Sequence, residues 1–509
     1  MSREPRGLVV HPPGEPPEVA GHSAIADTFA GRVHMEWDAT APVTPFGQLP
    51  FFIDYLKQAG LFDRWVDDCP LLWTSPNAPR KRDLLGTVLL SVLAGHRRYA
   101  HVTALRCDPV NPPLLGTRKV VSEDSVRRNL EKIDKAAGLA WLRNHLDYCT
   151  MPLLGEPWAL DIDSTIKPLY GHQEGAELGY NPHKPGRPSH CYHTYWLSNL
   201  RLVLRVDALP GDQHNVAHAT AGLWELLDRL GAKHRPVLLR GDKSWGIEPV
   251  MARAEQRSLP YLFRLRLTRN VRRALDLATL GWADAGKGWQ GKETSLRLVG
   301  WSRQRRVLLL RRKLPRQQGA DHGDPAQPRL GFIEIGSDQE AWEYAALVTS
   351  LDDEILTLGQ LYRDRADCEN AFDELKNQWG WGGFTTQDLT RCRLLAGIVA
   401  LVYNWWSLFV RLADPEHHRE AITTRPLLLS AIAQRTRHAG QVKLTISSAH
   451  GMRDQARHAY LRIAGFLAWL RKSAEQLDPL QRWYCILSEA LRHFLRGRQL
   501  QPPLRLNPA

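Results

Sequence analysis

Cysteine is scarce in this chain and widely spaced. The sequence has seven cysteines in 509 residues, and no two of them form a C-x-x-C pair. An odd and dispersed set argues against a disulfide framework and against a zinc ribbon, and it favours a reducing compartment. The seven are Cys69, Cys107, Cys149, Cys191, Cys368, Cys392 and Cys485.

Long apolar runs are also missing. The N-terminal residues contain no continuous apolar stretch, so we expect no signal peptide. A membrane-spanning helix needs about 20 consecutive apolar residues. Residues 392–412 come closest to that length, but Arg393, Asn404 and Arg411 interrupt them. We therefore expect a cytoplasmic protein that makes no use of a membrane.

Acidic residues are outnumbered by basic ones. The sequence has 54 Asp and Glu against 67 Lys and Arg, a formal net charge of +13. Residues 264–316 alone hold 15 basic and 3 acidic residues, a local charge of +12. Within that segment, residues 294–302 and 305–314 are predicted strands with interleaved cations and tryptophans nearby. Such a surface is typical of phosphate contact and base stacking, so we expect a polyanionic partner; a merely solvated basic face is the alternative.

Residues 157–267 alternate between strand-like and helix-like patterns. Three strand-like stretches come first, followed by a helix, a strand, a helix and a last strand. This order is typical of a mixed sheet with helices packed on it. The predicted elements are a strand at 158–166, a hairpin at 191–209, a helix at 218–232, a strand at 236–242, a helix at 248–258 and a strand at 261–267.

Two aspartates fall where predicted strands end. Asp163 lies near the end of the first strand, and Asp242 ends the fourth. Functional sites gather at strand ends in such sheets, although an aspartate there is more often a turn or cap residue. Asp161 shares the strand face of Asp163 and is an alternative to it. The functional interpretation therefore depends on a third carboxylate elsewhere in the chain.

The third carboxylate belongs to the stretch YRDRADCENAFDELK at residues 362–376. If this stretch is one helix, a phenol, a guanidinium, a carboxylate and an ammonium fall within about a quarter of its circumference. The carboxylate could hold a divalent cation while the neighbouring cations hold phosphate oxygens. A solvated helix face with ordinary ion pairs is the alternative. The four residues are Tyr362, Arg365, Glu369 and Lys376.

Two other segments could contact DNA. The Gly-rich polar loop at residues 167–191 carries Lys184 and Arg187, which could follow a DNA backbone. Residues 122–133 are a predicted helix, with Ser122 as its N-cap and an apolar inward face. Its basic side resembles that of a helix-turn-helix, although an ordinary surface helix gives the same pattern. The basic residues are Arg127, Arg128 and Lys132.

Together these residues resemble the bacterial insertion-sequence DDE transposases that carry the Y-R-E-K signature. The resemblance covers residues 157–412, the expected catalytic core. One position departs from the family pattern, since Lys243 follows Asp242 where the family commonly has a small residue. The matching motifs are DST at 163–165, LYGHQEGAELGYNPHKPGRPSH at 169–190, RGD at 240–242 and Y-x2-R-x3-E-x6-K at 362–376.

The resemblance implies a fold and a set of roles. The fold is α/β: an RNase H-like mixed sheet flanked by helices, with a β-rich insertion before the glutamate helix. Asp163, Asp242 and Glu369 would be catalytic and would hold two Mg²⁺ ions per site, with Mn²⁺ as a substitute. The expected phosphate-binding residues are Tyr362, Arg365, Lys376, Lys184 and Arg187, and Arg127, Arg128 and Lys132 would belong to a DNA-binding helix.

The function implied is that of a nucleoid-associated bacterial DNA transposase. It would cut at transposon inverted-repeat ends and join the 3′-OH ends to target DNA by two-metal phosphoryl transfer. Its partners would be double-stranded DNA and a second copy in a homodimer. A structure-selective nuclease or resolvase of the same fold is an alternative, as is a DNA-binding regulator that has lost catalysis. A basic RNA scaffold is a further one, but we find no RNA-module signature.

The expected domain organisation follows from these patterns. It comprises a disordered, basic, Pro/Gly-rich arm at 1–44, a helical DNA-binding domain at 45–150, the first part of the core at 151–268, a basic β-rich insertion at 269–350, the glutamate helix and the following helix of the core at 351–412, and a helical dimerisation or DNA-contact region at 413–509.

Overall fold

The computed structural model describes most of the chain. Residues 1–22 of the predicted disordered arm lie outside the described part. The described residues are 23–503, with gaps at 39, 74, 182–183, 214–215, 315–341, 450 and 474.

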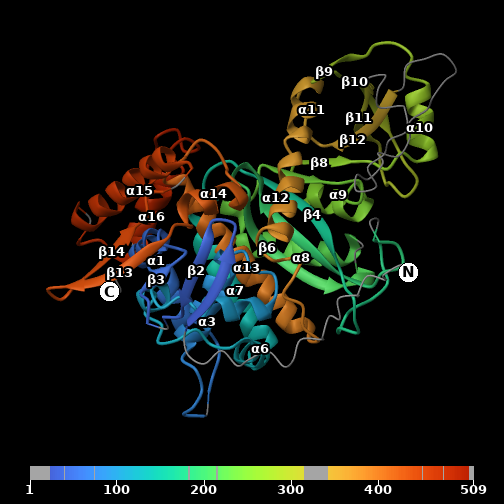
Figure 1. The fold of residues 1–509 in the computed structure, drawn as a ribbon. Helices are drawn as coiled ribbons and strands as arrows, with labels where there is room; N and C mark the ends of the chain where they lie inside the picture. The colour runs from blue at the N-terminus through green and yellow to red at the C-terminus, as the bar shows by residue number, and fades with distance from the viewer. Residues whose placement is uncertain are drawn as a thin grey trace, which may run out of the picture.

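A nine-stranded mixed sheet runs through the body of the molecule and out into the lobe at the upper right of Figure 1. In chain order its strands are β4 Ala159–Pro168, β5 Ser189–Leu197, β6 Leu202–Pro210, β7 Leu238–Gly241, β8 Tyr261–Arg264, β9 Ala283–Gly286, β10 Trp289–Leu296, β11 Arg305–Lys313 and β12 Trp342–Thr349. Their order across the sheet is β6-β5-β4-β7-β8-β12-β11-β10-β9. The strands β4, β7 and β8 are parallel, and every other neighbouring pair is antiparallel. The predicted α/β class, a mixed sheet flanked by helices, is thus confirmed.

Helices cover both faces of the first half of the sheet. The strand β5 is buried along its whole length. Its successive side chains point to opposite faces. Tyr195 Oη donates to the carbonyl of Ala219 in α8 (Val216–Leu230) at 2.7 Å, whereas the neighbouring Trp196 packs against Phe372. The core therefore has two layers of helix with the sheet between them.

The other helices lie along the sheet, in the body and in the lobe (Figure 1). They are α2 Leu61–Asp67, α3 Lys81–Leu93, α4 Val102–Leu105, α5 Asn111–Leu114, α6 Glu123–Glu131, α7 Lys135–Thr150, α9 Glu248–Gln256, α10 Arg269–Asp276, α11 Ile355–Arg363, α12 Ala366–Asn377 and α14 Ala421–Leu428.

The helix α13 (Leu389–Arg411) runs through the middle of the protein. Among the described residues it is the one helix that is long and apolar enough to cross a membrane, judged by length and composition alone. Of that apolar window, 94% is buried inside the protein, as in a core helix. Its Asn404 exchanges two hydrogen bonds of 2.8 and 2.9 Å with the backbone N–H and C=O of Val203 in the edge strand β6. A side chain of the helix thus satisfies backbone groups that a neighbouring strand would otherwise bind.

The two ends of the described chain pack together. The helix α1 (Leu49–Gln58) lies against α15 (Arg453–Ser473) and α16 (Pro479–Ala490). Figure 1 shows these blue and red segments side by side. The short strand β3 (Val43–Thr44) pairs with β13 (Ala433–His438), which joins the same two ends again.

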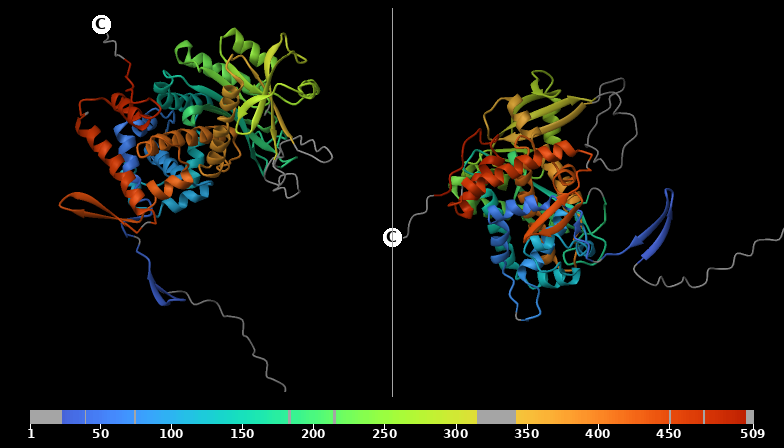
Figure 2. Two further views of the ribbon diagram at one scale, coloured as in Figure 1. Left: turned by 90° about the horizontal axis from the view of Figure 1, so that it is seen from above. Right: turned by 60° about the vertical axis from the view of Figure 1, so that its left-hand side comes forward.

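Two regions contain strands that the sequence patterns did not predict. The predicted disordered arm includes an antiparallel hairpin of β1 (Ser23–Thr28) and β2 (Gly31–Glu36), which stands away from the body in Figure 2. The predicted helical C-terminal region includes the hairpin of β13 and β14 (Gln441–Ile446). Its turn residues Ala439 and Gly440 both have positive φ, of 47° and 76°, which suits a tight two-residue hairpin turn.

Candidate functional site

The structure brings the two predicted aspartates together. The strands β4 and β7 are parallel neighbours, and Ile162 lies opposite Gly241. Asp163 and Asp242 each follow directly in this register, so they lie side by side where β7 ends. Parallel neighbours are about 4.8 Å apart, which places the two carboxylates within reach of a shared ligand.

The turn after β7 orients Asp242. The backbone N–H of Ser244 donates to Asp242 Oδ1 at 2.9 Å, and Ser244 Oγ lies 3.5 Å from Oδ2. The ring of Trp245 packs back against Gly241, where an added Cβ would meet the ring at 2.7 Å. The Lys-Ser-Trp sequence that departs from the family pattern therefore holds the strand end and its aspartate in place.

Asp161, the alternative to Asp163, has a structural partner. Arg240 binds it in a bidentate manner, with Nε to Oδ1 at 2.6 Å and Nη2 to Oδ2 at 2.8 Å. Asp161 is 0% exposed and Arg240 is 3% exposed. Because both oxygens of Asp161 accept hydrogen bonds from a buried guanidinium, this geometry favours Asp163 as the site residue.

The glutamate stretch is not one helix, and this part of the prediction is wrong. The helix α11 ends at Arg363 and α12 begins at Ala366, with a turn at 364–365 between them. The N–H of Arg365 bonds to the carbonyl of Tyr362 at 3.1 Å, three residues back rather than four. This tightening breaks the regular α-helical spacing on which the predicted face depends.

Arg365 stands at that break and links two of the carboxylates. Its buried guanidinium donates to Asp163 Oδ2 and lies 3.6 Å from Glu369 Oε1. The Glu369 side chain is 69% exposed. One cation therefore neutralises part of the acidic cluster while Glu369 stays accessible to solvent.

Burial and neighbouring charges act together on Asp163. Burial raises the pKa of Asp163 to about 6, and the negative charges of Asp242 and Glu369 add to this, while Arg365 opposes it. Burial disfavours the charge on Arg365, but Asp163 together with Tyr362, Cys368 and Asp242 outweighs burial and raises the pKa of Arg365 well above its ordinary value. The three carboxylates are thus close enough to share one electrostatic environment.

A cavity of about 420 Å³ lies at this cluster. Its walls are formed by the turn after β7, by the strands β8, β10, β11 and β12, and by the helices α11 and α12, with Arg365 between the two helices. Arg264 and Trp289 also line it, and the sequence patterns did not identify them as site residues, although both lie in the +12 segment. The charged and aromatic lining residues are Asp242, Lys243, Arg264, Trp289, Glu343, Tyr362, Arg363, Arg365 and Glu369.

The donor set suits a hard divalent cation. Carboxylate oxygens are the ligands that Mg²⁺ and Mn²⁺ prefer. Among the residues that the structure describes, however, no three His, Cys, Asp or Glu side chains are gathered closely enough to hold a metal ion. Asp163 and Asp242 are adjacent, and a metal site that included Glu369 would require its exposed side chain to turn toward them.

The remaining residues of the signature flank this site. Burial raises the pKa of Tyr362, which lines the cavity from α11. Burial lowers the pKa of Lys376 in α12, and Asp373 and Asp163 oppose that shift. Lys376 is half-buried and does not line the cavity within the described residues.

The loop residues Lys184 and Arg187 gather around an exposed tyrosine. Lys184 Nζ lies 5.0 Å and the Arg187 guanidinium 4.8 Å from the ring centroid of Tyr170. Both cations and the tyrosine are exposed. The loop therefore presents a small cationic and aromatic surface that is separate from the residues lining the cavity.

The predicted helix at 122–133 is present as α6. Its N-cap is also as predicted, since Ser122 Oγ accepts from the N–H of Ser125 at 3.3 Å. Arg127 forms an ion pair with Asp124 at 2.5 Å, and Arg128 lies 3.8 Å from the same carboxylate. These pairs neutralise part of the basic side, and Lys132 is exposed at the C-cap. A DNA-reading role for this helix stays a prediction.

Comparison with known proteins gives two findings. The family described as "Transposase DDE domain group 1" matches residues 76–466. Among solved structures, a piggyBac transposase in a synaptic complex with hairpin DNA is 12% identical, with a TM-score of 0.38. The match covers 88% of this chain and 86% of that chain. The comparison with curated proteins yields no match.

Proposed function

Since the chain belongs to the transposase family described as DDE domain group 1, we propose that it cuts DNA at the inverted-repeat ends of a transposon and joins the freed 3′-OH ends to target DNA. The observation that carries this proposal is the arrangement of Asp163, Asp242 and Glu369. Asp163 in the middle of β4 lies beside Asp242, which directly follows the neighbouring parallel strand β7, and Arg365 links Asp163 to the exposed Glu369. A phosphodiester-cleaving site needs such a set of hard oxygen ligands beside cations.

We propose that the core is RNase H-like. The order β6-β5-β4-β7-β8, with three antiparallel strands followed by parallel ones, supports this proposal. The strands β9 to β12 would be the basic insertion at 269–350, although they extend the core sheet rather than forming a sheet of their own. The helical segments at 45–150 and 413–509 would contact DNA or a second subunit.

Asp163, Asp242 and Glu369 would hold two Mg²⁺ ions, or Mn²⁺ as a substitute. When bound, these ions supply activation of the attacking oxygen, stabilisation of the leaving oxygen and neutralisation of charge. Ser244 keeps Asp242 oriented for this task. The exposed side chain of Glu369 has the freedom to close on the two aspartates.

The cations of the site would grip the DNA backbone. Arg365 and Tyr362 line the cavity beside the carboxylates, so they would contact phosphates next to the cut. Lys376 would act one to two helical turns further along α12. Lys184 and Arg187 would follow the backbone farther from the chemistry, because phosphate contacts position a duplex without reading its sequence.

The partners and setting complete the proposal. The substrate would be double-stranded DNA, both the inverted-repeat ends and the target. Pairing of two ends implies at least two active sites, so we propose a homodimer. The chain would act at the nucleoid in the cytoplasm of a bacterium, as part of an insertion sequence.

The test is nicking of plasmid DNA with Mg²⁺ by the full chain and by Glu369→Gln. We expect the variant to lose about a hundredfold or more in nicking rate, because a metal ligand is removed from transition-state stabilisation. DNA binding should stay unchanged, because the basic surface supplies affinity. Asp373→Asn, an exposed carboxylate on the same helix, is the matched control and should nick like the wild type.

Wild-type nicking by Glu369→Gln would refute the assignment of this carboxylate. A second readout separates transposition from nuclease activity alone. With a transposon-end substrate, a transposase yields products in which the end is joined to plasmid, whereas a nuclease or resolvase yields only cut DNA.

A further inference from the structure

A second, larger groove lies beside the catalytic cavity. Its volume is about 920 Å³. One wall is the turn after β7 with the start of α9, another is the segment from β8 into α10, and a third is the loop after β10. Lys243 lines both this groove and the catalytic cavity, so the two hollows meet at the residue that follows Asp242.

The groove is positively charged. Lys243, Arg266 and Arg269 line it, and all three are exposed. Within the described part of the chain, none of these three side chains forms a hydrogen bond or an ion pair. Unpaired cations that face one hollow repel one another, and a bound polyanion relieves that repulsion.

The acidic side chain in the groove is already neutralised. Among the described residues that line it, Glu248 carries the only negative charge. Its carboxylate accepts from Arg305 Nη1 at 2.6 Å and from Ser302 Oγ at 2.5 Å. These hydrogen bonds lower the pKa of Glu248, with burial opposing them. Glu248 therefore stays ionised and paired, and it leaves the three cations without a counter-charge.

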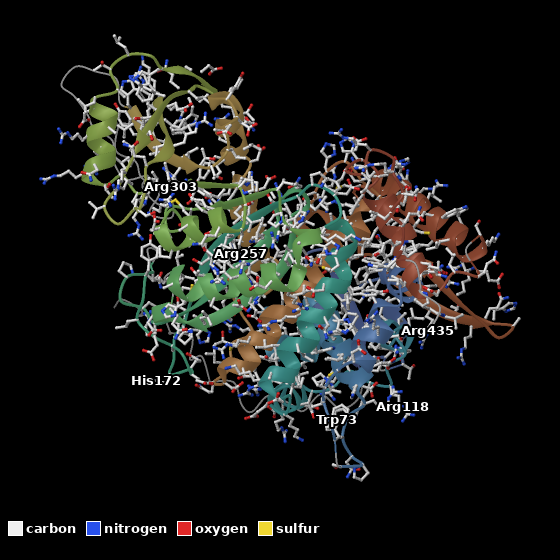
Figure 3. The ribbon with its side chains drawn as sticks, turned by 180° about the vertical axis from the view of Figure 1, so that it is seen from behind. Trp73, Arg118, His172, Arg257, Arg303 and Arg435 are labelled. Atoms are coloured by element: carbon white, nitrogen blue, oxygen red, sulfur yellow. The ribbon has the colours of Figure 1, made fainter. Side chains whose placement is uncertain are left out.

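The walls of the groove are held rigidly against each other. Arg305 of β11 also donates to Glu255 of α9 at 2.7 Å, and its side chain is 2% exposed. Arg303, at the junction between the upper lobe and the body in Figure 3, pairs with the same Glu255 at 2.9 Å. This ion-pair network joins α9 to β11 and to the residues just before β11, so the groove exists before a ligand enters it.

We propose that this groove holds the phosphate backbone of a DNA strand as it leaves the catalytic cavity. Lys243 contacts the phosphate nearest the cut, and Arg266 and Arg269 contact later phosphates of the same strand. Neutral donors in the groove, Thr268 and Asn270, supply hydrogen bonds between these charges. This inference rests on the proposed function, since it requires DNA in the neighbouring cavity.

The test measures how DNA affinity depends on salt. The full chain in a Glu369→Gln background binds a short labelled duplex, or one of its strands alone, without metal. We expect Arg266→Ala/Arg269→Ala to lower the slope of log K against log salt by about 1.8 for the duplex or about 1.4 for the single strand, because each lost phosphate contact removes about 0.9 or 0.7. Lys233→Ala/Arg235→Ala removes two exposed cations that precede β7, at the opposite end of that strand from Asp242, and should leave the slope unchanged.

A crosslinking readout locates the DNA. Thr268→Cys in a Cys107→Ser background, labelled with a photo-crosslinker, should attach to DNA on irradiation, whereas Lys233→Cys in the same background should not. An unchanged slope in Arg266→Ala/Arg269→Ala, or DNA captured from residue 233 and not from residue 268, overturns the proposed role of the groove. Wild-type plasmid nicking with Mg²⁺ is measured alongside. If nicking is present the failure concerns the groove alone, and if it is absent the proposed function fails with it.

Discussion

Removing the charge of Arg240 should destabilise the protein strongly, although Arg240 does not line the proposed catalytic cavity. Its guanidinium donates both hydrogen bonds to Asp161 and also donates to Ser198 Oγ and to the carbonyl of Leu361. The substitution Arg240→Met keeps most of the side-chain volume. It leaves Asp161 as a buried carboxylate without a counter-charge.

The expected magnitude follows from this burial. Breaking a buried ion pair by removing one partner costs about 3–5 kcal/mol. Unfolding entropy near the midpoint is roughly 2.1 cal/mol/K per residue, so a cooperative transition of a chain this long has about 1.1 kcal/mol/K. The thermal midpoint of Arg240→Met should therefore fall by about 3–5 °C.

The assay compares thermal midpoints of the full chain and three variants. Arg128→Met is the matched control, since Arg128 is 73% exposed and forms only a 3.8 Å pair; its midpoint should move by no more than about 1 °C. The double variant Asp161→Leu/Arg240→Met should recover most of the midpoint, because an apolar pair of similar volume needs no counter-charge. It should still nick DNA more slowly than the wild type, since the anchor on Leu361 at the end of α11 is lost.

Two outcomes would refute this reasoning. An Arg240→Met midpoint within about 1 °C of the wild type would mean that Asp161 is solvated or protonated without cost. A double variant no more stable than Arg240→Met would mean that the loss comes from packing and not from an unpaired charge.

Two further predictions concern pH. Asp163 has a pKa raised to about 6, chiefly by burial; a carboxylate must lose its proton to bind a divalent cation, so Mg²⁺-dependent nicking should fall as pH drops through about 6. A pH-rate profile that stays flat down to pH 4.5 or so would contradict this. Burial alone would raise the pKa of Glu255, but hydrogen bonds from Arg305, Arg303 and Tyr261 outweigh burial and lower it to about 2 from an ordinary 4.5. Its stabilising effect is present above 4.5 and disappears as pH falls toward 2, so the midpoint gap between wild type and Glu255→Gln should shrink below about pH 4.5; a constant gap would contradict the linkage.

Local sequence patterns were sufficient to predict the strands and helices of the core between residues 157 and 267. The stretches at 158–166 and 236–242 are apolar and of strand length, and the structure has the strands β4 and β7 there. Asp242 directly follows β7, as predicted, but β4 continues to Pro168, so Asp163 lies in the middle of its strand and not near the end. The hairpin turn near Ser198 and the helix stop at Gly231, which has a φ of 68°, were also predicted. These features depend on residues close together in the sequence, which is why one sequence reveals them.

Pairing between distant segments could not be read in this way. The register that places Asp161 opposite Arg240 joins residues 79 positions apart. The sequence favoured Asp163 through the Asp-Ser-Thr motif, but only this register shows that Asp161 has a buried structural partner. Likewise, the basic strands were expected to form an inserted unit, yet β12 pairs with β8 and continues the core sheet. A strand pattern shows that a segment needs neighbouring strands for its backbone hydrogen bonds, but it does not identify which strands these are.

The break between α11 and α12 changes what the Y-R-E-K spacing means. Offsets of 0, 3, 7 and 14 suggest one face of a straight helix, but the chain tightens at Arg365 and starts a new helix. Tyr362 consequently lines the cavity from α11 and Glu369 from α12, while Arg365 at the bend reaches across to Asp163. On a straight helix, Arg365 and Glu369 would form an ordinary exposed pair four residues apart. The bend instead buries the guanidinium among carboxylates. The Y-R-E-K spacing therefore brings Tyr362, Arg365 and Glu369 to one cavity from two helices and the turn between them, and it does not line them up along one face of a single helix.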